Sequence, residues 1–194
     1  MDTWAALPDA PILETGALGS RFRRRGCTTL RQAARYLHDL PYGRNSDRSD
    51  FRLVLSEGRG TCSTKHAVLA ALGQELGIAV QLTMGIYEMS EANTPGVGPV
   101  LERYQLSSIP EAHTYLRYRH RRVDITRSGI EPRAEIQNFI LEQDIRPDQI
   151  GDYKVSFHRT FLRQWLSQHP ELSHFTPEAL WEIREACIFA ISAA

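Results

Sequence analysis

The sequence has few cysteines, no net charge and no long apolar run. Its 194 residues include three cysteines, and 23 basic residues balance 23 acidic ones. No stretch approaches the roughly 18 consecutive apolar residues that a membrane span requires, and no internal repeat or low-complexity tract appears. These absences argue against a disulfide-stapled scaffold, a membrane-spanning protein and a repeat protein.

The balance of charge bears on possible partners. Without a net positive charge, the chain has no global field that would collect nucleic acid or an anionic membrane surface. Arginines do gather locally, at residues 21–25 and again at 117–122, but a solvated surface explains such clusters more simply than a ligand site does. We therefore expect neither a nucleic-acid partner nor a membrane partner.

The cysteines and the first residues of the chain bear on the cellular compartment in which we expect the protein. Cys27, Cys62 and Cys187 are an odd number and form no CxxC pair, which disfavours zinc fingers and disulfide frameworks. The first residues include Asp2 and Glu14 instead of a basic segment followed by an apolar one, so we expect no secretory signal. The sequence thus predicts a cytoplasmic protein with reduced thiols.

A single folded domain over residues 1–194 is the expected organisation. Apolar residues make up 42% of the chain and charged residues 24%, as in ordinary water-soluble domains. Residues 1–20 show little periodicity, so we expect them to run over the surface and to be the least ordered part.

Periodicity predicts the main elements of this domain. The spacing of apolar residues favours a helix near 29–39, an Ala/Leu-rich helix from Lys65 to Leu76, and an apolar strand after Gly77. The expected later elements are a hairpin of strands 113–118 and 121–126 and, beyond Pro132, helices at 157–166 and 179–191. This order predicts an α+β fold in which a small antiparallel sheet packs against helices, with a C-terminal helical extension over about 133–194.

Cys62 is the residue best placed for chemistry. It follows a turn that contains Gly58 and Gly60 and lies at or next to the first position of the strongest predicted helix. The N–H groups and dipole at a helix start favour a thiolate over a thiol, which makes a cysteine there a nucleophile. The alternative is an inert buried cysteine, because free cysteines often pack in cores.

A thiolate nucleophile needs an imidazole and a group that orients it, and His113 and Asp124 fit these roles. If they lie directly opposite each other, the hairpin is centred just after Tyr118, and a loop of four residues, 117–120, satisfies that register. Taken singly, each residue also has an ordinary structural explanation, as a satisfied strand histidine or a turn-capping aspartate.

Three competing interpretations are weaker. His66 lies four residues after Cys62 on the same helical face, where a base would sit below the thiol instead of across a cleft. Cys62, His66 and His113 could be metal ligands, but no fourth ligand has a characteristic spacing. The glycines before Cys62 lack the GxxxxGK[ST] order of a phosphate-binding loop. We therefore expect no metal and no cofactor.

The combined pattern resembles a known family. GTCSTKHAVLAALGQELGI, a strand and then EAHTYLRYRHRRVDIT are similar to the core of the transglutaminase-like, papain-related cysteine enzymes, over about residues 28–127. The resemblance implies a catalytic triad of Cys62, His113 and Asp124 and a thioester intermediate. It also implies a hydrolase or acyltransferase that acts on a peptide, protein or other amide-bearing substrate.

Some positions depart from the family pattern. Many members carry an aromatic residue, usually Trp, soon after the histidine, whereas Thr114 and Tyr115 follow here. The oxyanion donor that we favour is the Cys62 backbone N–H, and Tyr42 is a candidate for the side chain beside it. The main hypothesis is an acyl-transfer enzyme whose acceptor is water or an amine. The alternative is a catalytically inactive binding or scaffolding protein with the same fold.

Overall fold

The computed structural model describes residues 3–14, 16–126, 136 and 138–192, and the chain divides into two compact units. Unit 1 comprises residues 1–84, 114–130 and 143–151. Unit 2 comprises residues 85–113, 131–142 and 152–194. The single domain expected from the sequence stays a prediction.

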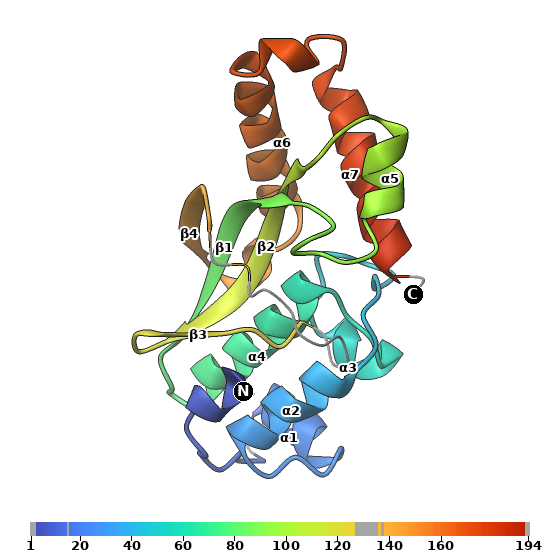
Figure 1. The fold of residues 1–194 in the computed structure, drawn as a ribbon. Helices are drawn as coiled ribbons and strands as arrows, with labels where there is room; N and C mark the ends of the chain where they lie inside the picture. Colours follow the sequence, from blue (N-terminus) through green and yellow to red (C-terminus); the bar gives the residue numbers. More distant parts are fainter. Residues whose placement is uncertain (1–2, 15, 127–135, 137, 193–194) are drawn as a thin grey trace. The chain divides into compact units, whose positions relative to one another are not determined.

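An antiparallel sheet of four strands is the β part of the fold (Figure 1). The strands lie in the order β3-β2-β1-β4. Their bounds are Val80–Met89 for β1, Ile109–Tyr118 for β2, Arg121–Val123 for β3 and Leu141–Ile145 for β4. The predicted α+β class is confirmed, whereas β4 replaces part of the segment that we expected to be helical.

The hairpin between β2 and β3 corrects the expected register. Leu116 pairs with Val123, and Tyr118 pairs with Arg121, so the hairpin is centred one residue later than predicted. The expected loop of four, 117–120, is therefore wrong: Arg117 and Tyr118 still belong to β2, and the turn has two residues. Arg119 makes this turn possible by adopting a positive φ of 55°. Strand β3 ends at Val123 and not at the expected residue 126, so Asp124 follows the strand. If the register continued by one residue, Asp124 would lie opposite Tyr115 and not opposite His113.

Helix α4 (Cys62–Glu75) is the centre of unit 1. Every residue from Cys62 to Ala70 is buried, as in a helix that is surrounded by other elements. The other unit 1 helices are η1 (Thr3–Ala6), α1 (Ala17–Arg23), α2 (Leu30–Asp39), α3 (Leu53–Glu57) and η2 (Pro147–Gln149). Of these, α1, α2 and α3 all contact α4 (Figure 1). The predicted helices near 29–39 and from Lys65 are confirmed.

The N-terminal segment is part of the core of unit 1, which contradicts our expectation for residues 1–20. Leu7 is fully buried. The backbone N–H groups of Leu18 and Gly19 donate to the Glu75 carboxylate at 2.9 and 2.6 Å. This carboxylate satisfies two N–H groups at the start of α1, which a helix cannot satisfy itself. Because the partner is distant in sequence, local periodicity does not reveal it.

Unit 2 contains α5 (Gly98–Arg103), α6 (Asp152–Ser167), η3 (Pro170–Leu172) and α7 (Pro177–Ser192). Helix α7 contacts both α5 and α6. The predicted helices at 157–166 and 179–191 are confirmed, whereas residues 133–135, where the expected extension begins, lie outside the described residues. Within the described part of the chain, no helix is both long enough and apolar enough to cross a membrane.

Candidate active site

Helix α4 begins at Cys62 because the residues before it stop one helix and start another. Gly58 ends α3 in the left-handed conformation, with φ 65°, which a glycine adopts without strain. Thr61 caps α4 reciprocally with Thr64, whose Oγ1 accepts the Thr61 N–H at 3.0 Å. Cys62 is therefore the first helical residue, as the sequence predicts.

Gly60 brings a second loop close to Cys62. A Cβ on Gly60 would lie 2.9 Å from both Thr64 Oγ1 and Val54 Cγ2, so only glycine fits there. Gly60 also forms an isolated parallel bridge with Tyr42, in which the Gly43 N–H donates to the Gly60 carbonyl at 3.3 Å. The candidate Tyr42 is thus anchored by its backbone to the loop that leads into the predicted nucleophile.

The Cys62 side chain is buried among hydroxyl groups. It is 7% exposed, and its Sγ lies 3.9 Å from Ser63 Oγ. Ser63 Oγ in turn lies 3.3 Å from Thr114 Oγ1 on β2. Polar atoms next to a buried thiol stabilise a developing negative charge better than an apolar pocket does.

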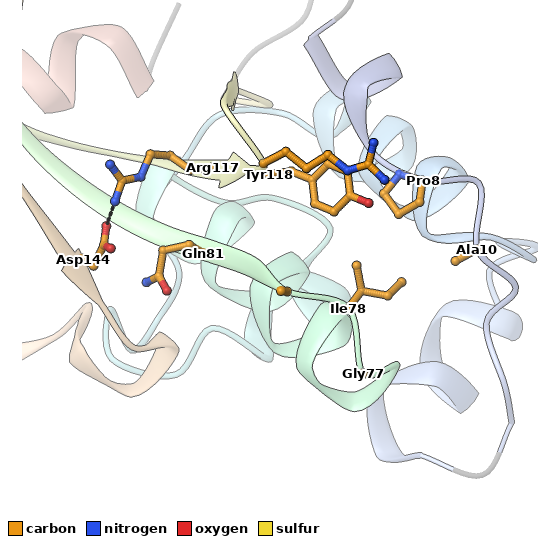
Figure 2. Close-up of a pocket in the computed structure, with 10 residues that line it drawn as sticks. Pro8, Ala10, Gly77, Ile78, Gln81, Arg117, Tyr118 and Asp144 are labelled. Atoms are coloured by element: carbon orange, nitrogen blue, oxygen red, sulfur yellow. Dashed lines mark hydrogen bonds and ion pairs between the residues drawn. The ribbon is translucent and has the colours of Figure 1, made fainter.

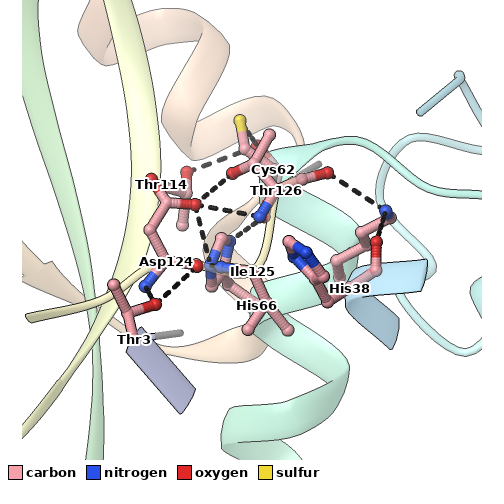
Figure 3. A network of polar contacts seen from close by, with 10 residues as sticks. Thr3, His38, Cys62, His66, Thr114, Asp124, Ile125 and Thr126 are labelled. Atoms are coloured by element: carbon pink, nitrogen blue, oxygen red, sulfur yellow. Dashed lines mark hydrogen bonds and ion pairs between the residues drawn. The ribbon is translucent and has the colours of Figure 1, made fainter. Parts of the chain in front are cut away.

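His66 connects the first turn of α4 to the segment after β3 (Figure 3). Its Nδ1 lies 2.7 Å from the Cys62 carbonyl oxygen, and its Nε2 lies 2.8 Å from the Ile125 backbone nitrogen. A carbonyl only accepts and an amide N–H only donates, so Nδ1 carries the hydrogen and Nε2 the lone pair. His66 is therefore a neutral imidazole whose two ring nitrogens both bond to backbone groups.

Asp124 lies in the same network, and its position is fixed on several sides. The Thr3 hydroxyl donates to the Asp124 carbonyl at 2.7 Å and accepts the Asp124 N–H at 3.0 Å. Oδ1 of Asp124 accepts both the N–H and the hydroxyl of Thr126. The same oxygen lies 3.5 Å from His66 Nε2. The side chain is still 32% exposed, so it is fixed in position and remains accessible to solvent.

Lys65 fixes the segment after Asp124 from the other side. Although it is charged, Lys65 is fully buried. Its Nζ donates to the carbonyls of Leu40 at 2.6 Å, Thr126 at 3.0 Å and His38 at 3.5 Å. Our sequence reasoning missed this residue. A Lys-His pair inside an otherwise Ala/Leu-rich helix is the signal that could have revealed it, because buried charged groups require partners.

His113, the predicted base, lies in unit 2 and is 6% exposed. Its ring centroid is 6.2 Å from that of Tyr87 in an edge-to-face arrangement. The Tyr87 hydroxyl is hydrogen-bonded to Thr94 Oγ1 at 2.9 Å. The structure thus assigns Cys62, Asp124 and Tyr42 to unit 1 and His113 to unit 2, and the triad stays a prediction.

A buried ion pair lies two residues before His113 on β2. The carboxylate of Glu111 bonds to the Arg184 guanidinium through two nitrogens. Burial is the largest single influence and raises the pKa of Glu111, but the charge and hydrogen bonds of Arg184, together with the nearby His158 and Lys154, outweigh it and lower the pKa to about 2. Burial lowers the pKa of nearby His158 to about 4, and His158 Nε2 donates to the Pro110 carbonyl at 2.9 Å.

A hollow of about 790 Å³ lies elsewhere in unit 1 (Figure 2). It borders the turn after α4, and therefore the end of that 14-residue helix opposite Cys62, about 20 Å away along the helix axis. An exposed ion pair between Arg117 and Asp144 lines it, together with Tyr118. None of the predicted site residues lines this hollow.

Among the described residues, no group of three His, Cys, Asp or Glu side chains could hold a metal ion. The side chains around the start of α4 offer a buried thiol at Cys62, an oriented carboxylate at Asp124 and hydrogen-bond donors. No family model matches the chain, and neither a curated protein nor a solved structure matches it.

Proposed function

We propose that this protein is a cysteine-dependent acyl-transfer enzyme of transglutaminase-like type. Cys62 is the nucleophile, His113 the general base and then acid, and Asp124 the carboxylate that orients the imidazole. The observation that supports this proposal is the hydrogen-bonded path from the Cys62 carbonyl through His66 to Ile125, the residue after Asp124. It links the predicted nucleophile and the predicted orienting carboxylate through one buried side chain.

The reaction follows from these roles. The Cys62 thiolate attacks the carbonyl carbon of an amide or ester, and the carbonyl oxygen becomes an oxyanion next to the N–H groups of the first turn of α4. Collapse of this intermediate breaks the bond to the leaving group, which takes a proton from His113, and leaves a thioester on Cys62. Water or an amine then gives a proton to His113, attacks the thioester and releases the thiolate.

Asp124 suits its role because the two hydrogen bonds that its side chain accepts from Thr126 do not require its charge. Thr126 donates both of its hydrogen bonds to Oδ1, and an asparagine oxygen accepts the same two bonds. In an Asp124→Asn variant the segment therefore keeps its Thr126 contacts, while the imidazole loses the negative charge that stabilises its protonated form.

The test measures how fast an iodoacetamide-type reagent modifies each thiol between about pH 5 and pH 9, read by peptide mass spectrometry. Burial raises the pKa of Cys27, and it raises that of Cys187 to about 11, so these two thiols are slow internal references. An imidazole-paired Cys62 is expected to react well below pH 8, about tenfold or more faster than in a His113→Ala variant.

The matched control is His120→Ala, which removes an exposed histidine from the hairpin turn and should leave the Cys62 profile unchanged. Asp124→Asn should slow Cys62 at low pH, whereas Asp144→Asn, at an exposed ion pair, should not. If Cys62 behaves identically in the wild type and in His113→Ala, the enzyme proposal is wrong and a binding or scaffolding role replaces it.

A further inference from the structure

We propose that His66 is a positioning residue, which holds Asp124 at a fixed place relative to Cys62 through a neutral imidazole of the Nδ1–H form. This inference rests on the proposed function for its catalytic purpose. The link itself joins the backbone of α4 to the backbone of the segment after β3, and it depends only on the geometry within unit 1.

The link is short and fully enclosed. His66 has no exposed surface, so water does not compete for either ring nitrogen. One nitrogen bonds to the carbonyl of Cys62 itself, and the other bonds to the N–H directly after Asp124. A rigid ring that joins the two residues transmits any displacement of one to the other, which a flexible side chain would absorb.

His66 is unsuited to act as the base. Its Nδ1 hydrogen is directed to the Cys62 carbonyl, and its Nε2 lone pair already accepts the Ile125 N–H. To take a proton, Nε2 would have to release that N–H, which would leave a buried donor unsatisfied. The neutral ring is thus preserved by its partners, and Asp124 Oδ1, 3.5 Å from Nε2, receives no hydrogen from it.

Lys65 provides a second, separate attachment for the segment after β3, in addition to the link through His66. Its ammonium binds the carbonyl of Thr126 and two carbonyls at the end of α2, so the next residue along the segment is fixed independently. Lys65 therefore holds Thr126 next to the end of α2. His66 holds Ile125 next to the first turn of α4, which begins at Cys62. Losing His66 alone should therefore shift Asp124 without unfolding unit 1.

Two substitutions separate the two ring nitrogens. The Asn amide places its polar atoms near the position of Nδ1, so His66→Asn keeps a donor for the Cys62 carbonyl and loses the acceptor for Ile125. The Gln amide reaches the position of Nε2, so His66→Gln keeps that acceptor. If His66 positions Asp124, Gln should rescue what Asn loses, although both residues are polar, neutral and smaller than histidine.

The experiment uses the full chain labelled with ¹⁵N. In the wild type, imidazole nitrogen shifts should report the Nδ1–H form at neutral pH. Amide exchange of Ile125 should be slow in the wild type and in His66→Gln, and about tenfold or more faster in His66→Asn. Exchange of Leu72, at the far end of α4, is the control for overall stability. The rate of Cys62 alkylation at low pH should change in parallel with the protection of the Ile125 amide. We expect it to be slower in His66→Asn than in the wild type and close to the wild-type rate in His66→Gln.

An Nε2–H form in the wild type, or equal Ile125 exchange in the two variants, overturns the inference. If neither variant folds, the tautomer of the wild type decides the question alone. A wild-type Cys62 without enhanced low-pH reactivity overturns the proposed function instead, because the imidazole shifts and the Ile125 exchange are read independently of any activity.

Discussion

In unit 1 the buried Lys65 and His66 bond to backbone carbonyls and a backbone amide, whereas in unit 2 the buried Glu111 and Arg184 bond to each other. We refer to Lys65 and His66, together with Cys62 and Asp124, as the α4 network, and to Glu111 and Arg184 as the ion-pair cluster. Backbone partners are part of the chain path, so the α4 network determines where a segment runs. An ion pair joins two side chains, and both can be replaced together.

This difference indicates separate purposes. The α4 network includes the predicted nucleophile and the predicted carboxylate, and its neutral histidine leaves the charge of Asp124 in place. The ion-pair cluster ties α7 to β2, and its charges couple the stability of unit 2 to pH. We therefore expect the cluster to give the larger effects on stability and the network to give the larger effects on Cys62.

The largest loss of stability should follow Arg184→Met. This change leaves the buried Glu111 carboxylate without its guanidinium, at a cost of about 3–5 kcal/mol of unfolding free energy. Urea denaturation measures it. Adding Glu111→Leu should recover most of the loss, because an apolar pair replaces a buried ion pair at little cost. If the double variant is as unstable as Arg184→Met alone, an apolar pair cannot replace the ion pair, and this prediction is wrong.

The next effect is acid destabilisation of unit 2. Folding lowers the pKa of His158 from its ordinary value to about 4, so between about pH 6.5 and pH 4 the unfolded chain binds a proton that the folded chain does not. Stability should fall as pH decreases through this window. Below about pH 4.5 the low pKa of Glu111 extends the fall toward pH 2.

Urea denaturation at several pH values tests this prediction. His158→Gln keeps a donor for the Pro110 carbonyl and does not titrate, so it should flatten the upper part of the profile. An unchanged slope in that variant would assign the acid sensitivity to another group.

A smaller loss, about 2–3 kcal/mol, is expected for Lys65→Met, because the carbonyls of Leu40 and Thr126 lose their ammonium donor inside the core. Thermal or urea denaturation reports the change. Lys65→Gln retains an N–H donor on a shorter side chain and should lose less. Equal losses in the two variants would mean that the length of the lysine matters more than its hydrogen bonds.

The smallest effect should come from Arg117→Gln. Arg117 and Asp144 form an ion pair, but each side chain is 46% exposed, and water screens such pairs to below about 1 kcal/mol. Denaturation at low and high salt would detect any contribution. If Arg117→Gln lowers the free energy of unfolding as much as Lys65→Met does, exposed polar contacts stabilise this protein as much as buried ones, contrary to our expectation.

The sequence predicts the parts of the fold that local chemistry determines. Apolar spacing identified α2 and most of α4, although α4 begins at Cys62, three residues before the predicted start at Lys65. The hairpin itself was predicted, but its second strand ends at Val123 and not at residue 126. Its register was wrong because a positive φ at Arg119 is an uncommon choice for a residue other than glycine. Strand β4 was missed because LEQDI alternates only weakly between apolar and polar residues.

The candidate site was predictable only in part. Cys62 could be placed at or next to a helix start from the glycines before it and the Ala/Leu-rich segment after it. The hydrogen bonds of Thr3 to Asp124 join residues 121 positions apart, and no local pattern reveals such a pair. His66 was considered only as a rival base, since its role depends on which backbone groups face its two nitrogens.

The pairing of Glu111 with Arg184 has a consequence for synthesis of the chain. Arg184 follows Glu111 by 73 residues, so at about 5–20 residues per second it is made roughly 4–15 s later. Until then the strand that carries His113 has no partner for its buried carboxylate, and Glu111 remains hydrated. Unit 2 therefore closes only after α7 has been made, which delays the proposed chemistry until that point of synthesis.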